Sequence, residues 1–482
     1  MQSAQPDGQV LVADARAASE VLHEVLADTA AAFPGALGPM GFPADPKAFR
    51  STYPEVMPRF EAARLASGDR LAMARHAVGA LQRRLVWQDA GGSRPLADAL
   101  AEPAAPLELL QTDFPGEPGW RPSVVYRGER WEADRLADFG AELLGRGVVT
   151  AQASQALAWL ADNVLDAGVL RLTGRKIAVL GGGAEMAPTR LWLEAGADVL
   201  WLDVAPPPPS WQDASAMSGR LYWPAGNADL LAQPREILAT LIEFAAGRPL
   251  DLGLYAYAPG RARELRLTGV MNELVNAMPP ELVGSITVLV SPTTPTGLAE
   301  PDLAAMRARR EARPGWEAAL DNLGLLGRGG GCATMGEVAA TRTVVGIQGA
   351  SYQAAQYLGK VLVAECWAEE GPLGSAHPAP FRVSANTAAI TRTRSLGHPV
   401  FAAAFGGAAA FGVETLTPRQ SRRINGLLAL CDWLRPDRPV PGTVRVHGGI
   451  HTLPYPLESA LRIAAAIGFA RSPRLLRGLF GK

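Results

Sequence analysis

From Arg175 onward, short runs of β-branched and aliphatic residues alternate with stretches long enough to form helices. The runs are "KIAVL", "ADVLWLDV", "LDLGLYAYA", "SITVLVS", "FRVSANTA" and "GTVRVHGG". A strand buried on both faces reads as a continuous apolar run, and its alternation with helices is typical of a parallel sheet covered on both sides. The sequence therefore predicts an α/β fold with a doubly wound parallel sheet.

The chain before Arg175 has a different pattern. Apolar residues recur at three- and four-residue steps in "DARAASEVLHEVLADTAAAF" and "RFEAARLASGDRLAMARHAVGALQRRL", which indicates amphipathic helices. At 482 residues the chain is longer than one ordinary hydrophobic core needs, and the Pro/Gly-rich "FPGEPGWRP" suggests a boundary. We expect a mostly helical N-terminal domain over residues 1–125, connecting helices over 126–170, an α/β domain over 171–455 with an insert at 292–350, and a C-terminal helix and tail over 456–482.

Composition argues against several classes of function. The formal net charge is −1 and charged residues make up 19%, so the chain has no basic face for nucleic acid. The three cysteines, Cys332, Cys366 and Cys431, are widely spaced and form no CxxC pair, which suits a reducing cytoplasm. No apolar run reaches the ~18 residues of a membrane span, and the first residues lack the pattern of a signal peptide. We expect a soluble cytoplasmic protein.

A glycine turn follows the first apolar run, in "KIAVLGGGAEMAPTRLWLEAGADVLWLDV". Gly181, Gly182 and Gly183 permit a tight turn and let the backbone approach a pyrophosphate, which the N-terminus of the next helix would face. Gly181 and Gly183 match the first two glycines of GxGxxG, whereas Met186 stands at the third. The pattern indicates a dinucleotide site; a unit that binds another nucleotide, or none, is the alternative.

An acidic residue selects between the two nicotinamide cofactors. Asp203 ends the second apolar run, about 20 residues after the turn, where a carboxylate can accept hydrogen bonds from both ribose hydroxyls. The same carboxylate would repel a 2′-phosphate, and no arginine follows in "DVAPPPPS" to compensate. The sequence therefore predicts NAD(H) rather than NADP(H).

Segments over residues 171–452 resemble, in order, those of the short-chain dehydrogenase/reductase family, which has a Rossmann-type fold. "GSITVLVSP" is similar to the fifth strand of that family, and Ser291 falls on its catalytic serine. "FRVSANTAAITRT" is similar to the sixth strand and its continuation, and Thr393 falls on the threonine that holds the nicotinamide amide. The resemblance implies a Rossmann-type domain and leaves the N-terminal third of the chain unexplained.

The Tyr-x-x-x-Lys pair of the family is absent. Four residues after Tyr352 stands Gln356, and Lys360 comes eight residues after Tyr352 and three after Tyr357. Eight residues of α-helix are two turns plus about 80°, and three are about 60° short of one turn. Either tyrosine could share a helix face with Lys360, and the enoyl-ACP reductase branch also spaces the pair by about two turns. We favour Tyr352, because it begins the helix nearest to Ser291, and expect Tyr357 to face the core.

The resemblance also implies roles for these residues. Hydride transfer at a carbonyl needs a proton partner, and a tyrosine can serve once a nearby ammonium lowers its pKa from ~10. We expect Tyr352 to handle the proton, Lys360 to lower the pKa of Tyr352, and Ser291 to hold the substrate oxygen. The insert over 292–350 would act as a lid or a substrate wall.

Two strand ends depart from the family pattern. Ala258-Pro259-Gly260 stands where the family has Asn-Ala-Gly, and His447 stands where it has an aspartate. His447 and His451 lie four residues apart, but the glycines between them disfavour a helix, so no metal site is expected.

Two functions from different classes follow. The first is an NAD(H)-dependent oxidoreductase acting on a carbonyl/alcohol pair or an activated double bond of a partly apolar small molecule. The second is a catalytically inactive dinucleotide-binding protein that serves as a sensor or partner subunit, which the missing Tyr-x-x-x-Lys supports. The segment "FAAAFGGAAAFG" would suit an apolar substrate cover, and it would suit a core helix or a homodimer contact equally well.

Overall fold

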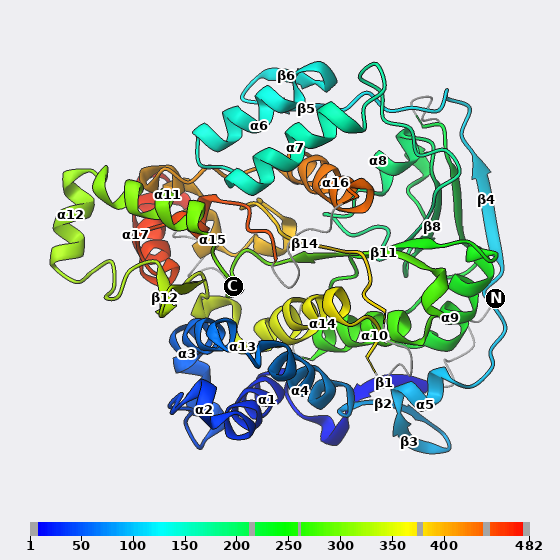
Figure 1. Ribbon diagram of the computed structural model, residues 1–482, viewed down its shortest axis with the longest axis horizontal. Helices are drawn as coiled ribbons and strands as arrows, with labels where there is room; N and C mark the ends of the chain where they lie inside the picture. Colours follow the sequence, from blue (N-terminus) through cyan, green and yellow to red (C-terminus); the bar gives the residue numbers. More distant parts are fainter. Residues whose placement is uncertain (1–7, 212–216, 259–261, 374–378, 437–443, 476–482) are drawn as a thin grey trace.

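The computed structural model describes residues 8–211, 217–258, 262–373, 379–436 and 444–475. Within them, a seven-stranded sheet runs through the centre of the molecule (Figure 1). From edge to edge its strands are β14 (Val383–Thr387), β11 (Val283–Val290), β10 (Leu250–Leu254), β7 (Lys176–Leu180), β8 (Asp198–Leu202), β9 (Arg220–Pro224) and β4 (Leu109–Asp113). All neighbours are parallel except β9 and β4. The prediction of an α/β fold with a mostly parallel sheet is confirmed.

Each face of the sheet has its own hydrophobic core, because successive side chains of a strand point to opposite faces. In β7, Ile177 and Val179 pack in one core, and Ala178 and Leu180 pack in the other. The first core includes residues of α7 (Ala151–Asn163), α8 (Thr189–Glu194) and α16 (Pro418–Leu434). The second includes residues of α9 (Pro234–Ala245), α10 (Arg263–Ala277) and the π-helical segment η6 (Ala354–Leu362). Burial on both faces explains why these strands read as continuous apolar runs.

The sheet also contains two strands that the apolar pattern does not predict. Strand β9, "RLYWP", begins with an exposed arginine, and β4, "LLQTD", is an edge strand without a fully buried residue. The predicted strand "GTVRVHGG" is wrong. Of its described residues, Arg445 pairs only in an isolated bridge with Asn386, and residues 437–443 lie outside the described part of the chain.

The N-terminal segment packs against the second core. It contains α1 (Ala18–Ala32), α2 (Pro34–Leu37), α3 (Pro46–Ala66), α4 (Arg70–Gln82) and α5 (Leu96–Leu100), with a small antiparallel sheet of β1 (Gly8–Val12), β2 (Leu85–Asp89) and β3 (Gly92–Pro95). Buried side chains such as Phe60 and Leu81 belong to the same hydrophobic core as α10 and η6. Arg64 of α3 also forms a buried ion pair with Glu365, at 2.7 Å. These helices thus share a core with the sheet, and the expected division into domains stays a prediction.

Further elements lie above the sheet and to its left in the view of Figure 1. Above α16 lie the hairpin of β5 (Ser123–Tyr126) and β6 (Glu129–Glu132) and helix α6 (Leu136–Gly145). At the left of the view lie α11 (Glu300–Glu311), α12 (Gly315–Asn322), α15 (Pro399–Gly407) and α17 (Leu457–Arg471), with the hairpin of β12 (Cys332–Met335) and β13 (Val338–Thr341). Among the described helices, none has the length and hydropathy needed to cross a membrane.

Candidate functional site

A cavity of about 790 Å³ lies at the carboxyl edge of the parallel strands. Part of its lining comes from residues that end or follow four strands: Ala184–Met186 after β7, Leu254 and Tyr255 at β10, Leu289–Ser291 at β11, and Ala388–Ile390 after β14. In open parallel sheets, ligands bind in the crevice beyond the carboxyl ends, where the strand order reverses. Here the order reverses between β7 and β10, and residues from both sides of that point line the cavity.

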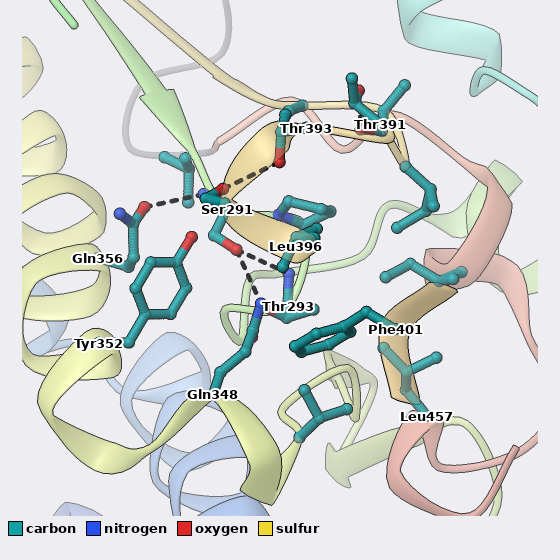
Figure 2. Close-up of a pocket in the computed structure, with 18 of the residues that line it drawn as sticks. Ser291, Thr293, Gln348, Tyr352, Gln356, Thr391, Thr393, Leu396, Phe401 and Leu457 are labelled. Carbon is teal, nitrogen blue, oxygen red and sulfur yellow. Dashed lines mark hydrogen bonds between the residues drawn. The ribbon is translucent and has the colours of Figure 1, made fainter. Parts of the chain in front are cut away.

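Four of the predicted site residues meet in this cavity. Ser291, Tyr352, Lys360 and Thr393 all line it, although they come from three separate segments of the chain. Figure 2 shows Ser291, Tyr352 and Thr393 around the cavity. The glycines Gly181–Gly183 and Asp203 are not among its lining residues, but the turn that continues from the glycines reaches it at Ala184–Met186. The predicted catalytic residues and the end of the glycine turn are therefore adjacent.

Ser291 is the centre of a network of hydroxyl and amide groups. Its Oγ lies 2.8 Å from Oγ1 of Thr293, which in turn donates to Oε1 of Gln348. The Tyr352 hydroxyl hydrogen-bonds with the Ser291 side chain. The Gln348 oxygen can only accept, so Thr293 donates to it and Ser291 donates to Thr293.

The helix that carries Tyr352 and Lys360 is not a regular α-helix. It begins as α13 (Ala350–Gln353), continues through the π-helical η6, and ends as α14 (Val363–Glu369). A π-helix closes its hydrogen bonds from i to i+5, so its turn is wider than that of an α-helix, and such segments are frequent at functional sites. The wider turn changes the angle expected for an α-helix, and both side chains reach the cavity. Tyr357 is fully buried in the core and donates to Glu61 at 2.5 Å.

The charges at the cavity differ from those expected. Lys360 is buried, donates to the Leu289 carbonyl at 2.9 Å, and has a lowered pKa because burial disfavours its charge. Burial raises the pKa of Glu264 to about 7, a shift that Lys360 and a hydrogen bond from Gln356 at 2.7 Å reduce. The pKa of Tyr352 is raised by burial and then by the charge of Glu264. The expectation that Lys360 lowers the pKa of Tyr352 is therefore wrong; its charge acts on Glu264.

The glycines of the turn are required by packing. Gly181 has a φ of +87°, and a Cβ there would lie 2.3 Å from the amide nitrogen of Ala256, after β10. A Cβ on Gly182 would lie 2.5 Å from the ring of Trp201. Both are contacts that no side chain tolerates, so these two glycines would be needed whether or not a ligand binds.

The amides of the glycine turn are also used inside the protein. Gly183 donates to Asp203 at 2.9 Å, and Gly182 and Ala184 donate to backbone carbonyls. Helix α8 begins only at Thr189, six residues after Gly183, so the expectation that a helix N-terminus directly follows the glycines is wrong.

The amides that stay available in this turn belong to the next two residues. Among the described residues, none accepts from the amides of Glu185 and Met186, and both residues line the cavity. The Glu185 carboxylate accepts from the amide of Arg394 at 3.0 Å, which joins the turn to the segment that carries Thr393.

The opposite side of the cavity is apolar and comes largely from α15 and α17. The predicted lid or wall, the insert over residues 292–350, contributes only its two ends. Its helices α11 and α12 lie behind the wall instead: Arg309 donates to the Gly449 carbonyl at 2.9 Å, and the Trp316 ring packs edge-on against Phe411, 5.2 Å between centroids. Because Phe411 lines the cavity, these helices support the wall from outside, whereas the ends of the insert line the cavity themselves, and the role of the insert as a lid or substrate wall stays a prediction.

The two histidines lie outside the cavity lining. His447 and His451 are buried, and burial lowers their pKa values to about 3 and about 4. Their Nδ1 atoms lie 2.9 Å from the carbonyls of Thr387 and Gly448. Among the described residues, no group of three His, Cys, Asp or Glu side chains could hold a metal ion. Residues Pro259 and Gly260, which replace part of the family's Asn-Ala-Gly, are outside the described residues.

Comparison with known proteins adds no assignment. Searches against protein-family models and against curated proteins find no match. What the arrangement can do is therefore inferred from its chemistry: Tyr352 can offer its hydroxyl to a ligand oxygen next to Ser291, and the buried Glu264 carboxyl and Lys360 amine interact electrostatically beside them. Sequence reasoning missed Glu264, Thr293 and the amide bridge through Gln356. The only sequence signal was that Gln356 occupies the family's lysine position.

Proposed function

We propose that this protein is an NAD(H)-dependent oxidoreductase acting on a carbonyl/alcohol pair or an activated double bond of a largely apolar small molecule. The observation that carries the proposal is the convergence of Ser291, Tyr352, Lys360 and Thr393 on one cavity at the carboxyl edge of the sheet. Convergence supports a shared function, because the hydroxyls of Ser291, Tyr352 and Thr393 and the amine of Lys360 have complementary chemical roles. A cytoplasmic location and a homodimer stay predictions.

The order of the strands supports a Rossmann-type assignment. Numbered from β7 in chain order, the six parallel strands follow the order 3-2-1-4-5-6. This order is typical of doubly wound sheets that bind dinucleotides at the switch point. The glycine turn follows the first strand, and Asp203 follows the second, at the places that such a cofactor requires.

The residues present fit NAD(H), with one change from the expected site: other backbone amides replace those of the glycines. Asp203 is half-buried and uses two of about four acceptor sites, on the amides of Gly183 and Ala205, which leaves capacity for ribose hydroxyls. The amides of Glu185 and Met186 would take the place of the glycine amides toward the pyrophosphate. Thr393 would hold the nicotinamide amide. When bound, NAD(H) supplies the hydride chemistry, which no side chain can provide.

Burial and the charge of Glu264 raise the pKa of Tyr352, so its phenol is protonated at neutral pH, as an ordinary phenol with a pKa of ~10 also is. Tyr352 would donate its proton when the substrate is reduced and would accept a proton when the product is oxidised. The Ser291 hydroxyl, whose Oγ lies 2.8 Å from Oγ1 of Thr293, would fix the same substrate oxygen once its hydrogen turns from Thr293 to the substrate. The charges of Lys360 and Glu264 would set the electrostatic potential at Tyr352 and Ser291.

Cofactor titration and turnover test the proposal together. Calorimetric titration with NADH should give saturable binding, and NADH oxidation in the presence of a panel of apolar ketones and enones should give turnover above the uncatalysed rate. Protein that binds neither NADH nor NAD⁺ would contradict the proposal. The control is Ser291→Ala, which should keep NADH affinity and lose turnover.

The second candidate is a dinucleotide-binding protein without catalysis. The observation that favours it is electrostatic: the pKa of Tyr352 is raised, and uncharged Gln356 stands where the family has its lysine. Such a protein would bind NADH yet exchange no hydride. Incubation with 4-deuterated NADH and the ketone panel, followed by mass spectrometry, separates the two functions, because only an enzyme transfers the label.

A further inference from the structure

The cavity has a polar end and an apolar end. Ser291, Thr293, Gln348 and Tyr352 lie together at the polar end, and Phe401 and Leu457 lie on the opposite side (Figure 2). The polar end has the hydroxyls that would hold the reacting oxygen. What the apolar end holds is not set by the reaction, because the hydride and proton transfers involve only the carbonyl group or the activated double bond.

The apolar end is formed by side chains that cannot hydrogen-bond. Helices α15 and α17 contribute Phe401, Phe405, Leu457, Ala460, Leu461 and Ala464 to the lining. A polar group placed against them would lose its water without gaining a partner, whereas each apolar carbon removed from water there is favourable. The volume of about 790 Å³ is well above the need of a small ketone, and pockets of this size accept drug-sized ligands.

The wall formed by the two helices is fixed rather than open to collapse. Gly407 of α15 packs so closely on α17 that a Cβ would lie 1.9 Å from the Ala464 carbonyl oxygen. Gly468 of α17 meets α15 in the same way, 1.8 Å from the Ala403 carbonyl oxygen. The backbones are thus in direct contact, and the space under them is preformed for a ligand.

From these observations we infer that the substrate is an amphiphile: it carries its reacting oxygen at one end of an extended aliphatic body that lies against α15 and α17. This inference rests on the proposed function only for the oxygen end of the substrate. The inference of an aliphatic body rests on the shape and chemistry of the wall formed by α15 and α17. Selectivity among substrates is therefore set by Ala460 and Ala464, whose small side chains leave room along the α17 side of the wall.

Calorimetric titration with straight-chain methyl ketones, from butanone to dodecanone, tests the inference with and without NADH. Affinity should rise about fourfold for each added CH₂ until the apolar end is filled, with a negative heat-capacity change. Ala464→Phe, and separately Ala460→Phe, should stop the rise at a shorter ketone and weaken the longest ketone by about tenfold or more, the equivalent of roughly two CH₂ groups. The matched control is Ala466→Phe, on the exposed side of the same helix.

Leu457→Ala keeps the test decisive where a phenylalanine variant does not fold. This substitution enlarges the cavity, so the affinity should continue to rise for longer ketones. Affinity that does not depend on chain length, or an equal loss in Ala466→Phe, would overturn the inference. If NADH fails to bind but the chain-length dependence persists and responds to Ala464→Phe, the aliphatic site stands and the oxidoreductase proposal falls.

Discussion

The amide of Ser291 donates a hydrogen bond to the side-chain oxygen of Gln356, at 2.9 Å, and so ties the end of β11 to the π-helical segment η6. The other end of the Gln356 amide donates to Glu264 at 2.7 Å. One side chain therefore joins a strand and two helices beneath the cavity, at the sequence position where the resembled family has a lysine. The bridge fixes Ser291 by a neutral group, and it leaves Lys360 to compensate the charge of Glu264.

The two tyrosines of this helix should respond differently to loss of the hydroxyl. Tyr352→Phe should lower the turnover rate by about 10²–10⁴-fold and leave NADH affinity unchanged, because it removes the proton donor. Tyr357→Phe should keep turnover but lower the free energy of unfolding by about 1–3 kcal/mol, since it leaves the buried Glu61 with one partner fewer. Steady-state kinetics and urea unfolding of both variants check this, and the reverse pattern would assign the chemistry to Tyr357.

Restoring the family's lysine should change the pH profile. In Gln356→Lys an ammonium stands four residues after Tyr352, which lowers the pKa of that phenol. The basic limb of the pH–rate profile should therefore move to lower pH. Gln356→Met is the matched control, because it removes the same hydrogen bonds without adding charge. A profile that shifts equally in both variants would mean that the hydrogen bonds, and not the charge, control Tyr352.

Cofactor choice should depend on Asp203. NADH should bind much more tightly than NADPH, because the Asp203 carboxylate repels a 2′-phosphate. Asp203→Ala should reduce the preference for NADH over NADPH. Asp203→Asn separates the loss of charge from a disturbed glycine turn, because it keeps an acceptor for the Gly183 amide. Calorimetry with both cofactors measures this. Equal affinities in the wild-type protein would remove Asp203 from its assigned role.

Those strands of the sheet that are buried on both faces could be predicted from the sequence. Strands such as β7 and β8 are buried on both faces, so they appear in the sequence as apolar runs. Strand β4 is an edge strand and β9 begins exposed, so neither has that signature. The amphipathic pattern of α3 predicts a helix with one buried face, but it does not say which surface covers it. Here the cover is the core shared with α10 and η6.

At the site, the resemblance identified the side chains but not their electrostatics. Ser291, Tyr352 and Lys360 follow from their positions relative to the resembled family, and all three line one cavity. The π-helical winding has no sequence signature of its own, so the angle between Tyr352 and Lys360 could not be calculated from α-helical geometry. Glu264 comes from another helix, and its effect on charge depends on burial, which only the packed structure defines.

The raised pKa of Glu264 makes stability depend on pH. Its pKa in the folded protein is about 7, against 4.5 for an ordinary glutamate side chain, so between these values the folded state binds more protons than the unfolded one. The free energy of unfolding contributed by this group should therefore fall as pH rises from about 4.5 to about 7, by at most ~1.4 kcal/mol per pH unit. Urea unfolding of Glu264→Gln at several pH values should show a flatter dependence than the wild-type protein. Glu281→Gln, at an exposed position, should leave the dependence unchanged.

Two adjacent glycines of α15 offer a test of the wall itself. A Cβ at Gly407 would lie 1.9 Å from the Ala464 carbonyl oxygen, so Gly407→Ala must push α15 away from α17. We expect a loss of about 1–3 kcal/mol in unfolding free energy, as overpacking typically costs, and a higher KM for long ketones. At Gly406 the nearest atom, the Gly468 Cα, would be 3.6 Å away, so Gly406→Ala should be neutral or stabilise the helix by about 0.5–1 kcal/mol. NADH affinity should stay unchanged in both variants, because neither glycine lies near the glycine turn or Asp203. If Gly407→Ala kept both its stability and its KM, the backbone contact between the two helices would not be what holds the apolar end open.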